Sequence, residues 1–284
     1  MNRPDGLLSP EIRLTAGVEY RRGGTYSWKL DIAVPAKRIR RPTPALVLVH
    51  GGGWCSCDKT SGMEIELIRR FAHEGYVALS VNYRLSQDAR FPAQIEDVKC
   101  AIRWLRAHAR RHGVDPNAIG AVGSSAGGHL VELLGLTTRA DGLEGDGPYQ
   151  GQSSAVQAVV SFCGPSDMTV FLKAMQAGGA SAVRQLLAGP PGTLPERARA
   201  ASPVTYVSRQ APPMLLIHGD RDETVPVTQS KALAAELRRA GARDVTLVVV
   251  KGAPHGVYGF ALEKNVARMT AFFERTLVGR TRKR

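Results

Sequence analysis

The pentapeptide G-S-S-A-G at residues 123–127 places a candidate nucleophile between two glycines. It follows an apolar run at residues 119–122 and precedes a helical pattern at 129–136. A G-x-S-x-G turn between a strand and a helix holds its central serine in a strained conformation with the hydroxyl exposed. We therefore predict that Ser125 is the nucleophile. Ser124 is the rival hydroxyl, but its position in the turn predicts that it faces away from the cleft.

Three consecutive glycines in the segment H-G-G-G-W, residues 50–54, follow the apolar run at 45–49. Glycines at such a point let the backbone approach a bound group with its N–H groups free, which an oxyanion hole requires. The expected donors are the N–H groups of Gly52, Gly53 and Ala126, the last at the start of a helix with its positive dipole end. A nucleotide-binding loop is disfavoured, because no G-x-x-x-x-G-K-[ST] pattern is present.

A serine hydroxyl needs a base within hydrogen-bonding reach, and seven histidines compete for this role. His255 lies in the loop G-A-P-H-G, residues 252–256, directly after an apolar run, where a side chain can reach across the top of a sheet. It is the predicted base. The other histidines fall in helical patterns or precede a glycine after a strand, where structural roles are expected: His73, His108, His112, His129, His50 and His218.

The carboxylate that orients the base is expected in the loop after the preceding strand. The segment H-G-D-R-D-E-T-V-P at residues 218–226 supplies three candidates, Asp220, Asp222 and Glu223. A serine followed along the chain by an acid and then a histidine is the order found in α/β-hydrolases.

Short apolar runs alternate with amphipathic helical patterns along the chain, which predicts a mostly parallel sheet with helices on both faces. The runs of the kind covered on both faces are residues 45–49, 77–81, 119–122, 156–162, 214–217 and 245–250, and an antiparallel lead-in is expected at 11–20 and 28–34. Helices are predicted at residues 63–74, 93–111, 129–136, 229–240 and 262–277. The tripeptide D-P-N at 115–117 is expected to break the chain before the next strand.

The chain is expected to form one domain over residues 1–284, with an insertion at 165–213. This insertion lacks a strand signal and holds two short helical patterns near 170–175 and 182–187. Long insertions after a strand often cover a site, so we predict that it forms a lid or substrate pocket.

The 284 residues carry a formal charge of +13, from 38 Lys and Arg against 25 Asp and Glu. The basic residues are scattered, with runs only at 37–41 and 280–284, and lack the interleaved aromatic residues of a nucleotide-stacking surface; nucleic acid is not an expected partner. The four cysteines, Cys55, Cys57, Cys100 and Cys163, lack the spacing of common metal motifs and favour no disulfide framework. Neither a membrane-spanning run nor a signal peptide is evident, which predicts a cytoplasmic protein, or a secreted one if a leader was removed.

Several segments together resemble the esterase/lipase branch of the α/β-hydrolase superfamily, above all the bifunctional feruloyl and acetyl-xylan esterases and, more loosely, the hormone-sensitive-lipase family. They are residues 50–54, 82–85, 91–99, 101–105, 123–129 and 218–222. The resemblance implies an α/β-hydrolase fold, and its H-G-x-x-D-x-x-V-P pattern selects Asp222 over Asp220. Cys57 stands where the family often has glycine, which puts a thiol near the cleft entrance.

The resulting hypothesis is a serine carboxylic ester hydrolase with the triad Ser125, His255 and Asp222, acting without metal or cofactor on a small-molecule ester. The family suggests short acyl groups, including acetyl or feruloyl esters of carbohydrates. Two alternatives remain: an amidase such as kynurenine formamidase, and a catalytically silent binding module with the same fold. For Arg84, Asp97 and Lys99 we expect structural ion pairing.

Overall fold

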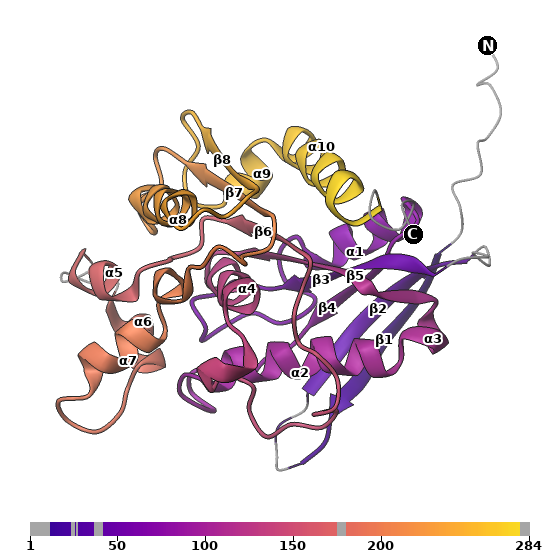
Figure 1. The fold of residues 1–284 in the computed structure, drawn as a ribbon, viewed down its shortest axis with the longest axis horizontal. Helices are drawn as coiled ribbons and strands as arrows, with labels where there is room; N and C mark the ends of the chain where they lie inside the picture. The colour runs from indigo at the N-terminus through magenta and orange to yellow at the C-terminus, as the bar shows by residue number, and fades with distance from the viewer. Residues whose placement is uncertain (1–11, 24–25, 27, 37–41, 175–179, 279–284) are drawn as a thin grey trace.

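The computed structural model describes residues 12–23, 26, 28–36, 42–174 and 180–278. Eight strands form one sheet in the order β1-β2-β4-β3-β5-β6-β7-β8 (Figure 1). Strands β3 to β8 pair in parallel, whereas β1 and β2 are antiparallel additions at one edge. The strands are β1 (Ile12–Arg21), β2 (Trp28–Pro35), β3 (Thr43–Val49), β4 (Val77–Val81), β5 (Val114–Ser124), β6 (Ala158–Phe162), β7 (Met214–Gly219) and β8 (Val245–Val250).

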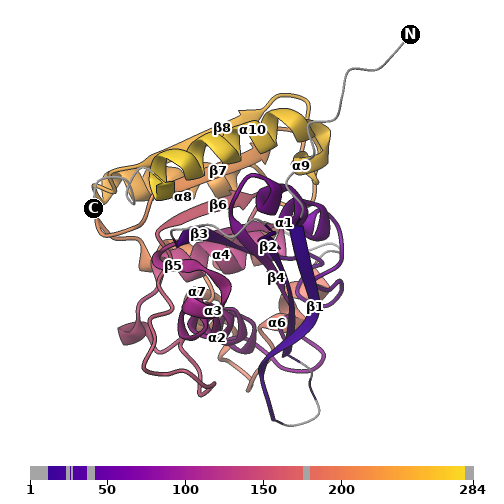
Figure 2. The ribbon, with the colours of Figure 1, turned by 90° about the vertical axis from the view of Figure 1, so that its right-hand side faces the viewer.

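Helices cover both faces of the sheet, and each face has its own apolar core (Figures 1 and 2). One core contains residues of α1 and α10, and the other contains residues of α2, α4 and α8. The helices are α1 (Glu64–His73), α2 (Ala93–Ala107), α3 (Ala109–His112), α4 (Ala126–Leu136), α5 (Met168–Ala174), α6 (Ala180–Leu186), α7 (Leu194–Ala200), α8 (Thr228–Arg239), α9 (Val257–Phe260) and α10 (Leu262–Phe273). This is the expected α/β-hydrolase architecture of a mostly parallel sheet between helical layers.

The predicted central strands are confirmed, because the continuous apolar runs of β3, β4 and β6 are buried at every residue. Two expectations are wrong. The D-P-N tripeptide at 115–117 does not precede the strand but lies within β5, where the pairing of Thr43 with Val114 is separated from the main ladder by a register shift. Strand β8 is not covered on both faces, because it lies at the edge of the sheet and Val249 is 39% exposed.

The other element boundaries differ in detail. The predicted helix 93–111 is interrupted between α2 and α3, and α3 ends where Gly113 takes a left-handed conformation. The insertion holds α5 and α6 as expected and a further helix, α7, that the sequence analysis did not anticipate. Some predicted features lie outside the described residues. These are both basic runs, 37–41 and 280–284, together with Glu11 at the start of the first predicted strand and Met175 at the end of a predicted helical pattern.

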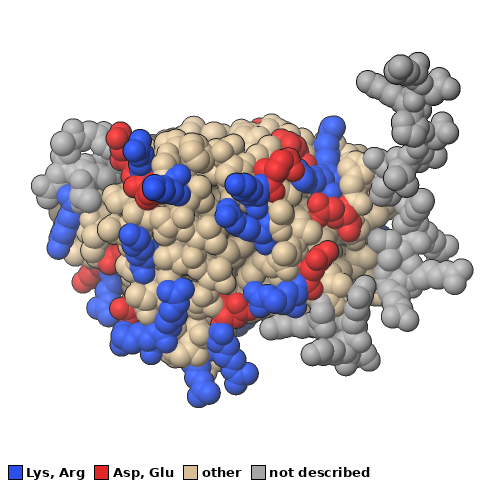
Figure 3. Space-filling model, turned by 90° about the horizontal axis from the view of Figure 1, so that it is seen from above, with Lys and Arg blue, Asp and Glu red and all other residues tan. Residues whose placement is uncertain are grey.

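Basic side chains are spread over the face seen in Figure 3, and acidic side chains lie among them. All four cysteines are free thiols. Arg84 pairs with Asp97 and Lys99 with Glu144, so the expected structural ion pairing of these residues is confirmed. Within the described part of the chain, no helix has the length and apolar character needed to cross a membrane.

Candidate active site

Ser125 sits in the turn between β5 and α4 with φ 55° and ψ −119°, a region that L-residues rarely occupy. The flanking glycines explain how this turn packs. A Cβ at Gly123 would lie 2.2 Å from the Gly127 carbonyl oxygen, and one at Gly127 would lie 2.0 Å from the Val49 carbonyl oxygen. Because both contacts are with backbone, neither neighbour can give way, and the turn requires glycine at both positions.

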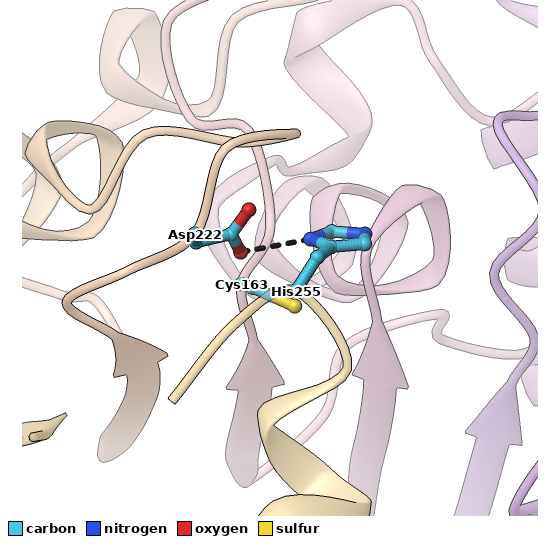
Figure 4. A group of neighbouring side chains, drawn as sticks. All are labelled: Cys163, Asp222 and His255. Atoms are coloured by element: carbon cyan, nitrogen blue, oxygen red, sulfur yellow. Dashed lines mark hydrogen bonds and ion pairs between the residues drawn. The ribbon is translucent and has the colours of Figure 1, made fainter. Parts of the chain in front are cut away.

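A chain of two hydrogen bonds joins the three residues predicted as a triad. His255 Nε2 lies 3.1 Å from Ser125 Oγ. On its other side, His255 Nδ1 lies 2.8 Å from Asp222 Oδ2, and Figure 4 shows this second contact. The three side chains follow the carboxyl ends of β5, β7 and β8. Ser125 and His255 are 130 residues apart in the sequence. The parallel sheet brings them to one edge, because the carboxyl ends of parallel strands lie together.

Asp222 is held by more donors than its catalytic partner alone. Its Oδ1 accepts the backbone N–H groups of Thr224 at 2.9 Å and Val225 at 2.8 Å, and its Oδ2 lies 3.3 Å from His218 Nε2. Burial by itself would raise the pKa of this carboxyl, but hydrogen bonds from the two histidines and from the Val225 N–H lower it well below its usual range. Asp222 therefore stays ionised.

The interaction between Asp222 and His255 shifts the pKa of His255 in the opposite direction, upward. Desolvation is the largest effect and lowers its pKa, but the hydrogen bonds and charge interactions with Asp222 and Cys163 together outweigh it and leave the pKa of His255 raised. The carboxylate thereby fixes the proton on Nδ1 and turns Nε2 toward the Ser125 hydroxyl, which is the geometry that a general base needs.

The remaining candidates have other partners. Asp220 accepts the Gly252 N–H at 2.6 Å. His218 contacts Ser230 Oγ and the Val225 carbonyl, and the His50 ring is stacked on Tyr83. Both histidines are thus held in structural contacts, as expected. Ser124 also lines the cavity described below, but the hydroxyl that His255 Nε2 contacts is that of Ser125.

The glycine segment forms a loop directly beside Ser125. Gly52 has φ 91°, and a Cβ there would lie 2.3 Å from the Ser56 carbonyl oxygen. The Gly52 carbonyl accepts the N–H groups of Cys55 and Ser56, while among the described residues the N–H groups of Gly52 and Gly53 have no acceptor. Ala126 opens α4, where the first N–H groups have no partner within the helix. These three N–H groups are the predicted oxyanion donors.

A buried histidine ties this loop to the insertion. The Trp54 indole N–H donates to His129 Nδ1 at 3.2 Å, and His129 Nε2 donates to the Ala201 carbonyl at 2.6 Å. Burial lowers the pKa of His129 to about 4, so the ring is neutral and keeps one tautomer. The insertion also approaches the glycines directly, because Ala182 Cβ would lie 3.6 Å from a Cβ at Gly53.

A cavity of about 450 Å³ lies beside the catalytic residues. It is lined by Ser125, His255 and the glycine loop, and also by Glu64 in the first turn of α1 and by residues of α9. This volume is in the range of small-molecule sites. Cys57 lines the cavity and is exposed, consistent with the predicted thiol near its entrance.

The sequence analysis missed three residues near the site. Cys163 directly follows β6 and is buried with φ 43°; its Sγ and ligand atoms of Asp222 and His255 lie within 4.8 Å of one another (Figure 4). These three could hold a metal ion, although Asp222 and His255 already bind each other. No motif marked Cys163. Glu64 and Tyr258 line the cavity, and Glu64 was detectable, because it continues the apolar face of Leu67, Ile68 and Phe71 at helical spacing.

The sheet order and the strand-turn-helix at Ser125 define the chain as an α/β-hydrolase. A model of the BD-FAE family matches residues 30–237. The chain therefore belongs to the BD-FAE family, and the resemblance to the esterase/lipase branch of the superfamily is confirmed.

Individual proteins give the same result. The chain is 36% identical over 219 residues to Esterase LipC of Mycobacterium tuberculosis, covering 76% of this chain and 53% of that protein. It spans about half the length of the curated relatives that it matches. Among solved structures it resembles a truncated carbohydrate esterase from gut microbiota (TM-score 0.84, 30% identity, 95% of this chain and 98% of the other). It also resembles Thermogutta terrifontis esterase 2 with bound butyrate (TM-score 0.76, 27% identity, 96% of each chain).

Proposed function

We propose that the chain is a serine carboxylic ester hydrolase. The observation that carries this proposal is the continuous hydrogen-bonded path from Asp222 through His255 to the Ser125 hydroxyl. The path ends at a cavity lined also by glycines 52 and 53, whose backbone N–H groups have no acceptor among the described residues. Relatives and structural neighbours named as esterases support the same chemistry.

The catalytic steps follow from the positions of these groups. His255 Nε2 takes the hydroxyl proton as Ser125 Oγ attacks the ester carbonyl, and Asp222 stabilises the imidazolium that forms. The oxygen that becomes negative accepts hydrogen bonds from the N–H groups of Gly52, Gly53 and Ala126. His255 then donates the proton to the departing alcohol, which leaves an acyl group on Ser125. Water, deprotonated by the same histidine, attacks the acyl-enzyme and releases the acid.

The substrates we propose are esters of short acyl groups, including acetyl or feruloyl esters of carbohydrates. Two observations support them: the cavity of about 450 Å³ suits a small molecule, and the structural neighbours include a carbohydrate esterase and an esterase with bound butyrate. We also propose that the insertion at 165–213 covers the site. Its support is the approach of Ala182 to the Gly53 backbone, together with the hydrogen bond from His129 to the Ala201 carbonyl.

A fluorophosphonate probe tests the nucleophile, and p-nitrophenyl acetate and butyrate test the reaction. We expect the probe to label the wild type on Ser125 and to leave Ser125→Ala unlabelled, with ester hydrolysis lost in the same variant. A folded wild type that neither reacts with the probe nor hydrolyses any ester would contradict the proposal and favour a silent binding module. Faster turnover of N-formylkynurenine than of acetyl esters would instead identify an amidase.

A further inference from the structure

The first turn of α1 brings a buried carboxyl group to the wall of the catalytic cavity. Glu64 is the first residue of this helix, its side chain is packed in with only 3% of the residue exposed, and it lines the same cavity as Ser125 and His255. The apolar neighbours that follow at helical spacing hold α1 against the sheet, so the position of Glu64 is fixed by the core rather than by a flexible loop.

Within the described part of the chain, the Glu64 carboxyl has neither a cationic partner nor a hydrogen bond from another residue. The contact it does make is with its own backbone N–H, and Asp58, its charged neighbour, has the same sign. Burial raises the pKa of Glu64, its own N–H lowers it and Asp58 raises it, and together these effects bring the pKa to about 7. An isolated buried carboxyl is costly, so a ligand that donates a hydrogen bond to it would offset part of that cost.

Tyr258 on α9 contributes a second unmatched polar group to the same wall. It lines the cavity, and its hydroxyl is buried without a hydrogen-bond partner among the described residues. Burial raises the pKa of this phenol, so the hydroxyl keeps its proton and can donate. Glu64 and Tyr258 therefore line the same cavity, and neither has a hydrogen-bond partner on another described residue.

We propose that Glu64, assisted by Tyr258, forms a subsite that binds a hydroxyl group of the ester substrate, with the Glu64 carboxyl as the hydrogen-bond acceptor. This inference rests on the proposed ester hydrolysis and specifies which esters the site selects: those carrying a hydroxyl group in addition to the ester. Glu64 and Tyr258 are thereby specificity-determining residues.

A neutral hydroxyl fits this subsite better than an ammonium group. The chain carries a formal charge of +13, which disfavours the approach of a cation. Among the described residues that line the cavity, Tyr258 is the one phenyl ring, so no aromatic cage of the kind that holds ammonium groups is formed.

The test compares esters that differ by hydroxyl groups. Propyl acetate is paired with glycerol 1-acetate, which varies the alcohol, and ethyl butyrate with ethyl 3-hydroxybutyrate, which varies the acyl group. The measured quantity is the ratio of kcat/KM for the hydroxylated ester to kcat/KM for its plain counterpart. We expect the wild type to prefer the hydroxylated member of at least one pair, because a site built to bind a hydroxyl discriminates against an analogue that lacks it.

The variants remove or keep the acceptor. We expect Glu64→Leu to reduce the ratio by about tenfold, and Glu64→Gln, which retains an acceptor oxygen, to keep most of it. Tyr258→Phe is expected to reduce the ratio several-fold, and it keeps the test valid if the leucine variant does not fold, because it removes a single oxygen atom.

Two matched controls separate binding from structure. Glu66→Gln changes an exposed carboxyl on the same helix. Tyr76→Phe removes another buried hydroxyl that has no hydrogen-bond partner on the described residues, at a position that does not line the cavity. We expect both to leave the ratio unchanged.

A ratio at or below one for the wild type in both pairs, or an equal ratio in all variants, overturns the subsite while the esterase proposal stands. A preference for an aminoalkyl acetate over glycerol 1-acetate also overturns it, in favour of a cation site. Failure of the proposed function looks different: the wild type would then hydrolyse no ester and would not react with the fluorophosphonate probe.

Discussion

The loop after β7 and the start of α1 surround a carboxyl group in opposite ways. Asp222 receives two backbone N–H groups and two histidine contacts, and these lower its pKa. Glu64 is also buried, yet it has no donor from another described residue, and its pKa is raised. The Asp222 carboxyl is thus kept ionised, whereas the pKa of the Glu64 carboxyl is brought close to neutral pH.

This difference distinguishes two kinds of group. The hydrogen bonds of Asp222 are complete before a substrate binds, whereas Glu64 lacks a donor that a bound substrate would supply. A fully hydrogen-bonded carboxylate orients His255 without reorganisation during the reaction. An unmatched carboxyl instead gains most when a ligand supplies the missing donor. The variants below change one side of this comparison at a time.

Removing the nucleophile should have the largest effect. Ser125→Ala takes away the only hydroxyl that His255 contacts among the described residues, and we expect kcat for p-nitrophenyl acetate to fall by about 10⁴ to 10⁶. Ser124→Ala is the matched control and should retain most of the activity. Comparable losses in the two variants would show that the hydroxyl next to His255 is not the nucleophile.

Removing the charge of the orienting acid should come next. Asp222→Asn keeps the shape of the side chain but loses the carboxylate, and we expect kcat to fall by about 10⁴. The base acts only when His255 is neutral, so activity rises as the pH passes its pKa. Because Asp222 raises that pKa, the asparagine variant should move the acid limb of the kcat/KM profile to lower pH.

Asp220→Asn is the control for this change, because Asp220 is bound to the Gly252 N–H instead. It should leave the position of the acid limb unchanged. A limb that shifts in the Asp220 variant and not in the Asp222 variant would reverse the assignment.

Blocking the glycine loop should cost less. A methyl group at Gly52 would meet the Ser56 carbonyl oxygen, so Gly52→Ala must displace the loop that carries two oxyanion donors. We expect kcat to fall by about 10² to 10³. Gly75→Ala introduces similar backbone strain, at φ 96° with nothing within 4 Å, and should lower the melting temperature without this loss of kcat. Equal kcat values in the two variants would argue against an oxyanion role for the loop.

The smallest effect is expected at a third carboxyl, Glu132, which is buried and accepts hydrogen bonds from Ser161 and Ser166. Burial raises its pKa to about 8 in spite of these neutral donors. The folded state therefore holds the proton more tightly than the unfolded chain, whose pKa is near 4.5. The stability that this group contributes is complete below about pH 4.5 and is lost as the pH rises toward 8.

Glu132→Gln removes this titration, so the difference in melting temperature between pH 5 and pH 8 should shrink by a few degrees relative to the wild type. Thermal unfolding at the two pH values measures it, with the exposed Glu66→Gln as the control. An unchanged difference would mean that Glu132 does not hold its proton in the folded state. Neutral donors alone would then suffice to keep a buried carboxyl ionised, which would weaken the contrast between Asp222 and Glu64.

The sequence by itself determined the elements that depend on local pattern. Continuous apolar runs predicted the central strands, and the G-x-S-x-G turn predicted Ser125, because steric limits on the backbone act over a few residues. The error at residues 115–117 arose because Val114, directly before the tripeptide, already pairs with Thr43 of β3, so the turn signal produces a register shift inside β5 and not a break before it. The choice of Asp222 over its neighbours rested on family resemblance, since all three acids share one loop.

Only the tertiary structure decided which side chains share a cavity. The residues of two groups, Cys163 beside His255 and Glu64 with Tyr258, come from separate elements. Their placement depends on how helices and strand ends pack in three dimensions. Burial and distant hydrogen-bond partners, such as His255 for Asp222, also set the pKa of each group, and neither can be read from the neighbouring residues of the chain. For this reason the sequence predicted the triad, whereas the proposed substrate subsite of Glu64 and Tyr258 could be recognised only in the fold.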